Sequence, residues 1–424
     1  MRIIADLHIH SPHARAVSKD MTLENLDHWA RVKGITVMGT GDFTHPKWMK
    51  EIKEKLEPAE QGLYTLKGKN EKLKVSETST RFMLTVEISS IYSKGGKVRR
   101  IHNLIFAPSI ETAEKINTQL GWLGNLASDG RPILGLDSEG LAKVVFNVDP
   151  QAVIVPAHAW TPWFSVFGSM SGFDSIEECF GAFTPQIFAI ETGLSSDPAM
   201  NWRLSGLDAI ALISNSDSHS LQRIGREANV FDGELSYGGI MAVIRSHDPK
   251  RFLFTVEFFP EEGKYHYDGH SEHNVRMSPE ETRKASGKCP TCGWPVTVGV
   301  MSRVEALADR PSGAKPPNAI PFKRMVPLDE IIGGAFGVGE SSKKVKAEYH
   351  RLVSTFGSEF AVLLEAPPSD LKSAAPPEVA EGITRVREGR IRIEPGYDGE
   401  YGRVSIFDEA ERSRFAPGQT SLFR

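Results

Sequence analysis

The sequence has little of what marks a secreted or membrane-bound chain. It contains only three cysteines, Cys179, Cys289 and Cys292, which are too few and too unevenly spaced for a disulfide framework. No run approaches the roughly 18 consecutive apolar residues that a transmembrane helix needs. The N-terminus lacks a basic start followed by an unbroken apolar stretch, so no secretory signal is predicted. These absences predict a cytoplasmic protein that does not bind membranes.

Neither positive nor negative charge is in clear excess, and no internal repeat is visible. Lys and Arg number 50 and Asp and Glu number 54, and this net charge of −4 neither supports nor excludes a nucleic-acid partner. The hydrophobic fraction of 40% and the charged fraction of 25% are those of a soluble globular protein. A chain of 424 residues predicts two or three domains.

Residues 1–255 alternate short apolar runs with amphipathic stretches. The predicted strands are Arg2–Ala5, Thr36–Gly39, Phe82–Ser89, His102–Ala107, Ala152–Pro156, Ile187–Glu191 and Ala209–Ser214. Helices are predicted at Leu23–Lys33, after Thr22 as cap, and at Ser109–Leu120. Because polar residues follow the strands, this alternation predicts an α/β fold in the form of a βα barrel. A doubly wound open sheet is the alternative.

Residues that bind metals stand at the ends of six predicted strands. They are His8, His10, Asp42, Glu87, His102, His158, Asp217 and His219. His8 and His10 are two residues apart and so project from one face of the first strand. A single histidine of this kind is more often structural, but strand ends that meet at one barrel mouth predict a metal centre. Imidazole and carboxylate donors suit zinc, manganese or iron, and Glu87 can bridge two ions for displacement at phosphorus.

These motifs resemble the polymerase and histidinol phosphatase (PHP) family over about the first 250 residues. The matching residues are Asp6-Leu-His-Ile-His10, Glu87, His102, His158 and Asp217-Ser-His219. The resemblance implies a distorted (βα)7 barrel with a cluster of up to three metal ions. It also implies two ligand sets, one of His8, His10, Glu87 and Asp217 and one of Glu87, His102 and His158.

Two positions depart from that family's pattern. Ala16 stands where the family often has another histidine, and Phe43 replaces a ligand in the second motif. A third ion would have to rely on Asp42 and His219, with His45 as a further donor. Two ions are therefore expected, and the third site is left open.

A small zinc-binding lobe is predicted over residues 256–310. His270 and His273 form one pair and Cys289 and Cys292 a second, with 15 residues between the pairs. Two such pairs fit a tetrahedral structural zinc ion. His266 is an alternative to either histidine. Redox chemistry is disfavoured because no thioredoxin-like βαβ pattern surrounds the cysteines.

Residues 311–424 are predicted to form a helical region with a mobile tail. Helices are expected at Pro327–Ile332 and Lys343–Phe356, on either side of the glycine-rich Gly333–Gly339. These glycines do not follow a strand, which argues against a dinucleotide fold. A hairpin there would offer a DNA phosphate the backbone N–H groups of Gly337 and Gly339 and the positive charge of Lys343 and Lys344. A plain glycine turn beside a solvated lysine face is the alternative.

Two further segments suggest partners. Trp160, Trp163 and Phe164 follow His158 in a loop and are predicted to stack on an extruded base, with a local hydrophobic cluster as the alternative. The last six residues, Gln419–Arg424, resemble a clamp-binding tail, so a sliding clamp is a candidate partner.

Taken together, the barrel motifs, the cysteine pair and the helical tail resemble the endonuclease Q family over nearly the whole chain. The supporting strings are Gly41–Pro46, His158–Trp163, Glu191–Pro198 and Arg303–Arg310. The resemblance implies a DNA repair enzyme that cuts 5′ to hypoxanthine, uracil, xanthine or an abasic site. Deaminated bases pair weakly and so cost less to flip.

The same resemblance places Glu191 and Asp197 near the metals. The predicted catalytic residues are Asp42, Glu87, His158, Asp197, Asp217 and His219. Zn²⁺ is expected in the structural and the active site, and Mg²⁺ or Mn²⁺ also suits catalysis. The competing interpretations are a small-molecule phosphatase and a non-catalytic DNA-binding module. About 170 residues beyond the barrel argue against the first, and the intact ligand positions argue against the second.

Overall fold

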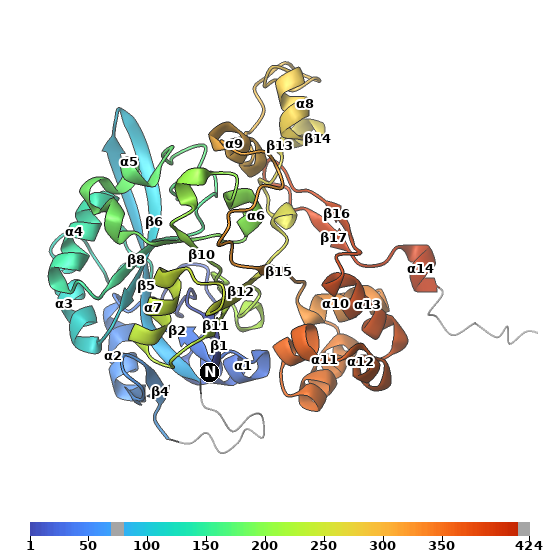
Figure 1. Cartoon of the computed structure of the whole chain (residues 1–424), viewed down its shortest axis with the longest axis horizontal. Coiled ribbons are helices and arrows are strands. Elements are labelled where there is room, and N and C mark those ends of the chain that lie inside the picture. The colour runs from blue at the N-terminus through green and yellow to red at the C-terminus, as the bar shows by residue number, and fades with distance from the viewer. Residues whose placement is uncertain (69–79, 414–424) are drawn as a thin grey trace, which may run out of the picture.

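The protein is described by a computed structural model that covers residues 1–68 and 80–413 (Figure 1). All seven strands predicted for the first 255 residues are present. They are β1 (Arg2–Asp6), β2 (Val37–Gly39), β5 (Arg81–Lys94), β6 (Lys97–Ala107), β8 (Val153–Pro156), β9 (Ala189–Glu191) and β10 (Ala211–Ile213). The tail Gln419–Arg424 lies outside the described residues, so its predicted clamp-binding role stays a prediction.

The fold is mixed α/β around a central sheet. β1, β2 and β5 run parallel, whereas β6 is antiparallel to both β5 and β8. Further strands extend the sheet beyond β1, namely β11 (Ala228–Asp232), β12 (Phe252–Glu257) and β15 (Phe322–Arg324). β9 and β10 form a separate parallel pair. The sheet is therefore less regular than an all-parallel arrangement, and a closed seven-stranded barrel stays a prediction.

Hydrogen bonds at the strand ends join the two sheets. The Ala159 N–H after β8 donates to the Glu191 carbonyl of β9, at 2.9 Å. The His10 N–H after β1 donates to the Ser218 carbonyl after β10, at 3.1 Å. The ends of β1, β8, β9 and β10 consequently lie together.

Side chains on one face of β5 and β6 are apolar at one end of the strands and polar further along. Met83 on β5 and Leu104 and Phe106 on β6 belong to one buried cluster, on the strand faces that also carry Glu87 and His102. Helix α7 (Tyr237–Ser246) adds Tyr237 to that cluster, whereas the other end is polar. Apolar packing thus fixes the strands that position the charged side chains.

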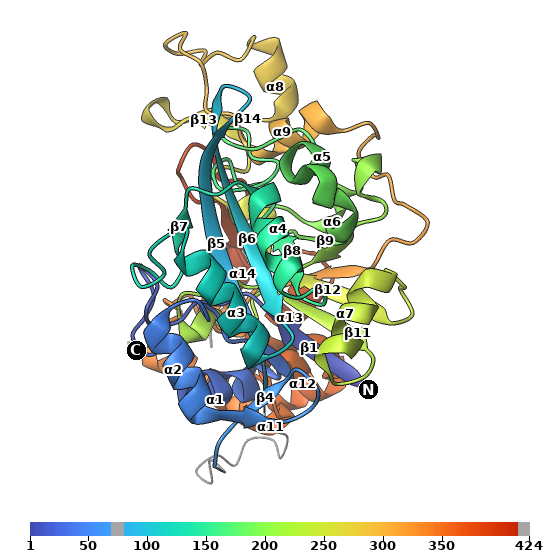
Figure 2. The ribbon, with the colours of Figure 1, turned by 90° about the vertical axis from the view of Figure 1, so that its left-hand side faces the viewer.

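Helices pack outside the sheet, and the predicted helices are confirmed. α1 (Leu23–Lys33) begins after Thr22, whose side chain accepts from the Asn25 N–H. α3 (Ile110–Gly121) begins after Ser109, whose side chain caps it in the same way. Figure 2 shows α3 and α4 lying across β5, β6 and β8. The others in this region are α2 (Pro46–Lys55), α4 (Ser138–Val148), α5 (Ile176–Phe180) and α6 (Pro198–Asn201).

A small lobe projects from the main body at the top of Figure 1. It holds β13 (Asp268–His270), β14 (Val275–Met277), α8 (Pro279–Lys284) and α9 (Val300–Leu307). Its own apolar core is minimal, with Met277, Cys289 and Val296 as its buried members. A core of this size needs another source of stability, as small domains generally do.

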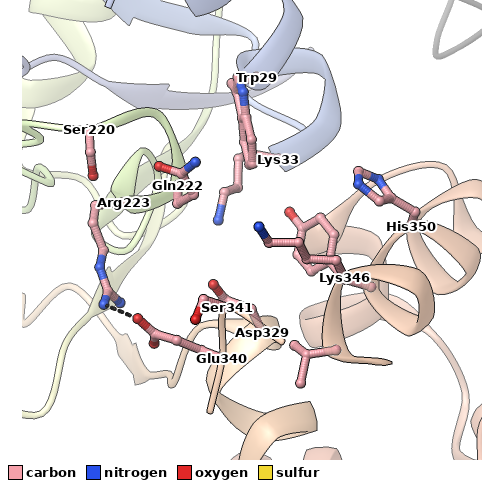
Figure 3. Close-up of a pocket in the computed structure, with 12 residues that line it drawn as sticks. Trp29, Lys33, Ser220, Gln222, Arg223, Asp329, Glu340, Ser341, Lys346 and His350 are labelled. Carbon is pink, nitrogen blue, oxygen red and sulfur yellow. Dashed lines mark hydrogen bonds and ion pairs between the residues drawn. The ribbon is translucent and has the colours of Figure 1, made fainter. Parts of the chain in front are cut away.

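The C-terminal region is mainly helical. It comprises α10 (Leu328–Phe336), α11 (Lys343–Phe356), α12 (Pro368–Ala374), α13 (Pro377–Arg387), β16 (Arg392–Glu394), β17 (Arg403–Ser405) and α14 (Glu409–Ser413). It meets the first region through the ion pair of Lys33 Nζ with Glu359 Oε2, at 2.6 Å, and both side chains are buried. A cavity of about 550 Å³ lies beside Lys33 (Figure 3). Arg223 bonds Glu340 across it, at 3.1 Å.

None of the helices in the described part of the chain has both the length and the hydropathy that crossing a membrane requires.

Candidate active site

Two groups of metal-competent side chains lie where the ends of β1, β8 and β10 meet the middle of β5 and β6. Glu87 and His102 are mid-strand residues of β5 and β6, so the prediction that they stand at strand ends is wrong. Within each group, one ligand atom per residue lies within 4.8 Å of all the others. The first group is His8, His10, Glu87 and Asp217, and the second is Glu87, His102 and His158. All are buried except Asp217, which is half-buried. These are the two ligand sets that the family resemblance implied.

Glu87 is shared between the groups, and each of its oxygens faces one of them. Oε1 lies 2.7 Å from His102 Nδ1 and 3.0 Å from His158 Nε2. Oε2 lies 3.3 Å from His10 Nε2 and 3.7 Å from His8 Nε2. This arrangement suits a carboxylate that bridges two ions.

The donor set fits metal ions on two further observations. His8 Nε2 is buried and has no hydrogen-bond partner among the described residues, which is costly unless another group satisfies it. Burial raises the pKa of Glu87, but His102, Arg131 and His8 outweigh this and lower it well below its usual value. Glu87 is therefore ionised and buried among imidazoles, as a metal ligand should be.

The backbone is strained at three predicted site residues. Asp42, His158 and Asp217 have φ angles of 51°, 29° and 45°, in the left-handed region that non-glycine residues rarely adopt. Each such residue costs on the order of 1–3 kcal/mol, and strain of this kind concentrates at functional sites. The fold thus maintains unfavourable backbone angles where two of the ligands are presented.

Carboxylates behind the ligands orient the histidines. Glu191 lies 3.0 Å from His8 Nδ1 and accepts the His158 N–H at 2.8 Å. Asp42 Oδ1 lies 3.0 Å from His10 Nδ1, and its other oxygen accepts the Ser11 N–H at 2.6 Å. Each contact leaves Nε2 of the histidine facing the centre. Glu191 therefore lies near the metal groups, as the resemblance implied.

Burial lowers the pKa of both supported histidines, but carboxylates reverse the effect. Glu191, Asp217 and Glu87 raise the pKa of His8 well above its ordinary value. Asp42, Asp217 and Glu87 do the same for His10. The carboxylates thus favour the charged form of both imidazoles when no ion is bound, which couples ion binding to proton release.

A third ion site is not assembled from the residues named for it. Among residues 1–68 and 80–413, neither Asp42, His219 nor His45 belongs to a group of three donors. His219 Nδ1 instead lies 2.9 Å from the Asp217 carbonyl oxygen. The His45 ring stacks on His13 at 4.4 Å. The structure thus places Asp42 behind His10 rather than among the ligands.

One site residue escaped the sequence analysis. Arg131 Nη1 lies 3.0 Å from Glu87 Oε2, and the side chain is 27% exposed. It comes from the loop between α3 and the short β7 (Ile133–Leu134). A lone arginine in a loop, outside any metal-binding motif, carries no sequence signal.

Comparisons with known proteins decide the family. Residues 327–390 match the family model described as the MJ0043 C-terminal domain. The uncharacterized protein MJ0043 of Methanocaldococcus jannaschii is 33% identical over 307 residues. The match covers 69% of this chain but only 38% of MJ0043, so this chain spans well under half the length of that relative.

Two solved structures match at nearly full length. One is the lesion-specific endonuclease PfuEndoQ from Pyrococcus furiosus, with 32% identity, a TM-score of 0.84 and 96% of each chain covered. The other is endonuclease Q in complex with a 27-mer duplex that carries an abasic lesion at the active site. It has 32% identity, a TM-score of 0.83, and covers 97% of this chain and 98% of that chain. The chain belongs to the endonuclease Q family.

The aromatic loop of this endonuclease Q family member divides into two parts. Trp163 and Phe164 line a cavity of about 480 Å³ together with His102 and His158. The Phe164 ring lies 4.6 Å from that of His102. Trp160 is fully buried, and its Nε1–H donates to Asn201 at 2.7 Å. The prediction that Trp160 stacks on an extruded base is therefore wrong, because its ring is not accessible.

Asp197 also has a different role from the one predicted. Its Oδ1 accepts the Met200 N–H at 3.0 Å and so caps α6. Its Oδ2 accepts from Arg324 Nε at 2.9 Å. Asp197 belongs to neither ligand group, and both of its oxygens are occupied, so it stabilises the fold rather than acting in catalysis.

The four residues proposed for a structural zinc ion do come together. His270, His273, Cys289 and Cys292 each offer an atom within 4.8 Å of the others. Burial raises the pKa of Cys289, but the backbone N–H groups of Cys292 and Thr291 lower it to about 6. Its thiolate is thus favoured at neutral pH, as zinc requires.

His266, the alternative ligand, is buried and does not belong to this group. The histidine pair and the cysteine pair therefore form the candidate zinc site by themselves.

The glycine segment differs from the expected hairpin. α10 continues through Gly333 and Gly334 to Phe336, and the turn begins only at Gly337. Gly337 has a φ of 66° and its N–H donates to the Gly333 carbonyl, which is the usual way a glycine ends a helix. Gly339, Lys343 and Lys344 are exposed. Both the phosphate-binding role and the plain turn therefore stay open.

Proposed function

We propose that the chain is a metal-dependent DNA repair endonuclease that hydrolyses the phosphodiester 5′ to a damaged nucleotide. The proposed lesions are abasic sites and the deaminated bases hypoxanthine, uracil and xanthine. The observation that carries the proposal is the pair of ligand groups sharing Glu87. Family membership supports it, since a solved relative is complexed with a duplex bearing an abasic lesion.

The two ligand groups would hold two ions. When bound, such ions lower the pKa of a water molecule and neutralise charge on the phosphate. Donors rich in imidazole suit Zn²⁺ or Mn²⁺ better than Mg²⁺. Asp42 and Glu191 keep His10 and His8 in the tautomer that presents Nε2 to the centre.

Proton transfer is assigned to His219. Both ring nitrogens of His158 are occupied, Nδ1 by Thr161 at 3.2 Å and Nε2 by Glu87 at 3.0 Å. His219 is 33% exposed, and its Nδ1–H donates to the Asp217 carbonyl oxygen. Its Nε2 then carries a lone pair that can accept a proton at the edge of the site.

The cavity beside His102 and His158 is the proposed place for the damaged nucleotide. Its volume of about 480 Å³ falls in the usual range for small-molecule sites. Trp163 and Phe164 supply rings for stacking, and Arg100 and Lys264 supply positive charge. An abasic residue would enter without stacking.

The remaining DNA contacts are proposed for the outer parts of the chain. The lobe with the candidate zinc site and the turn carrying Gly337, Gly339, Lys343 and Lys344 would hold the duplex. A sliding clamp bound through Gln419–Arg424 remains a proposal from sequence alone.

The direct test is a nicking assay with Mn²⁺ or Mg²⁺ on duplexes that carry one abasic site or one inosine. A single cut on the 5′ side of the lesion supports the proposal. Phosphate release from monoesters without nicking would indicate a small-molecule phosphatase instead. Asp217→Ala should abolish nicking but retain DNA binding. Asp208→Ala is the matched control, since Asp208 pairs with Arg310 near the start of β10.

A further inference from the structure

Arg131 is held beside the metal groups by the loop that carries it. The Gly130 N–H donates to the His13 carbonyl at 3.1 Å, and the Pro132 carbonyl accepts from Ser89 at 3.0 Å. β7 then pairs with β5 from Ser89 onward. A side chain at Gly130 would collide with the Asp42 carboxylate. The backbone on both sides of Arg131 is thus built into the walls of the site.

The guanidinium of Arg131 has bonding capacity that the described residues do not use. Its only hydrogen bond in that part of the chain is from Nη1 to Glu87 Oε2, at 3.0 Å. A guanidinium has five N–H donors in a planar fork. The side chain is 27% exposed, so part of it faces the solvent that a substrate would replace. Several donors therefore remain for a ligand.

The charge of Arg131 also points to an anion. Glu87 and Asp217 raise the pKa of Arg131, while its burial acts in the opposite direction. Arg131 is permanently charged and cannot ligate a metal. The donors that Glu87 leaves unused therefore suit a planar or tetrahedral oxyanion.

From these contacts we propose that Arg131 binds a non-bridging oxygen of the scissile phosphate. The proposal rests on the proposed function, because it requires a DNA phosphodiester at the two ligand groups. A purely structural role, in which Arg131 only holds Glu87 in place, is the competing interpretation. The two differ in what happens to ion binding when the arginine is removed.

The test compares Arg131→Gln and Arg131→Lys with the control Arg81→Gln. Arg81 is also half-buried and pairs with a glutamate, Glu60, but it lies at the start of β5, six residues before Glu87. Affinity for a duplex with an abasic analogue is measured in EDTA at several salt concentrations. Arg131→Gln should weaken binding and reduce the slope of log K against log salt by about one. Arg131→Lys should restore the slope.

A second arm uses a duplex whose scissile phosphate is replaced by an uncharged methylphosphonate. Wild-type protein should lose affinity for this duplex, and Arg131→Gln should lose less. With ions present, nicking by Arg131→Gln should fall by about 10²-fold or more, as for the loss of one oxyanion donor. The metal content of the variant, measured by mass spectrometry, should equal that of the wild type.

Two results would overturn the proposal. If Arg131→Gln loses bound ions, the arginine only positions Glu87. If the variant keeps the wild-type salt slope and methylphosphonate penalty, Arg131 does not touch the phosphate. Failure of the proposed function itself looks different, because the wild-type protein would then not nick lesion DNA at all.

Discussion

Asp42 Oδ1 lies 3.0 Å from His10 Nδ1, on the far side of the ring from Glu87. Asp42 was expected to ligate a metal, but its position makes it the residue that orients a ligand. Its second oxygen accepts from the N–H and the hydroxyl of Ser11, both at 2.6 Å. The histidine is therefore held in one tautomer by a carboxylate that is itself fixed.

Replacing Asp42 with Asn should weaken ion binding without unfolding the protein. An amide has only one acceptor oxygen, so it cannot serve both the Ser11 donors and His10 as the carboxylate does. It also carries no charge to stabilise His10. Loss of such a supporting contact typically costs about 10–100-fold in metal affinity. Competition titration with a chromogenic chelator measures this. An affinity equal to that of the wild type would show that Asp42 does not orient His10.

The small lobe that carries the candidate zinc site should depend on a bound zinc ion for stability. Its own apolar core has three buried members, so Cys289→Ser with Cys292→Ser should remove bound zinc and leave the segment from β13 to Val296 protease-sensitive. The lobe's cleavage by trypsin and the protein's zinc content check this. Wild-type protein treated with a strong chelator is the matched comparison. A lobe that resists trypsin after zinc loss contradicts the prediction.

Zinc retention should also depend on pH. The folded protein lowers the pKa of Cys289 to about 6. A thiol whose pKa is depressed by folding contributes stability above its unfolded value, and this stability is lost as pH falls through the folded value. Zinc affinity should therefore fall as pH falls below about 6, because protons then compete for the Cys289 thiolate, in chelator competition titrations at a series of pH values. An affinity that does not change below that pH would contradict the thiolate ligand.

Trp160→Ala should lower stability, whereas Trp163→Ala should weaken substrate binding. Trp160 is fully buried, so Trp160→Ala should cost about 3–5 kcal/mol of unfolding free energy. Trp163 is half-buried beside Tyr265, at 5.4 Å between ring centroids. Trp163→Ala should leave the melting temperature nearly unchanged and weaken binding of a base-bearing lesion by about 1–3 kcal/mol. Stacking would be excluded if Trp163→Ala lost the same affinity, relative to the wild type, for the inosine duplex as for the abasic duplex.

The strands and the convergence of several site residues were predictable from the sequence pattern, whereas the division into two ligand sets came from the family resemblance. A buried strand is a local pattern, and His8, His10 and Asp217 follow such strands directly. Residues that follow the carboxyl ends of strands in one barrel-like sheet converge, whereas Glu87 and His102 lie in the middle of β5 and β6, which the pattern did not predict. Local sequence therefore carried the information for this part of the site.

Other features depend on neighbours that sequence does not display. The antiparallel turn between β5 and β6 had a usable signal in Gly95-Gly96, where both φ angles are positive. The burial of Trp160 depends on Asn201, 41 residues away in sequence. Arg131 reaches Glu87 from a loop 44 residues away. Such pairings are set by tertiary packing, so no local sequence pattern predicts them.

The central claim is that Glu87 joins two ligand groups into one centre that cuts lesion DNA. The most direct measurement is a denaturing gel of an end-labelled duplex with one abasic site, incubated with Mn²⁺ and either wild-type protein or Glu87→Gln. The account predicts a single cut beside the lesion by the wild type, none by the variant, and lower metal content in the variant. Equal cutting by both proteins, or none by the wild type, would contradict it.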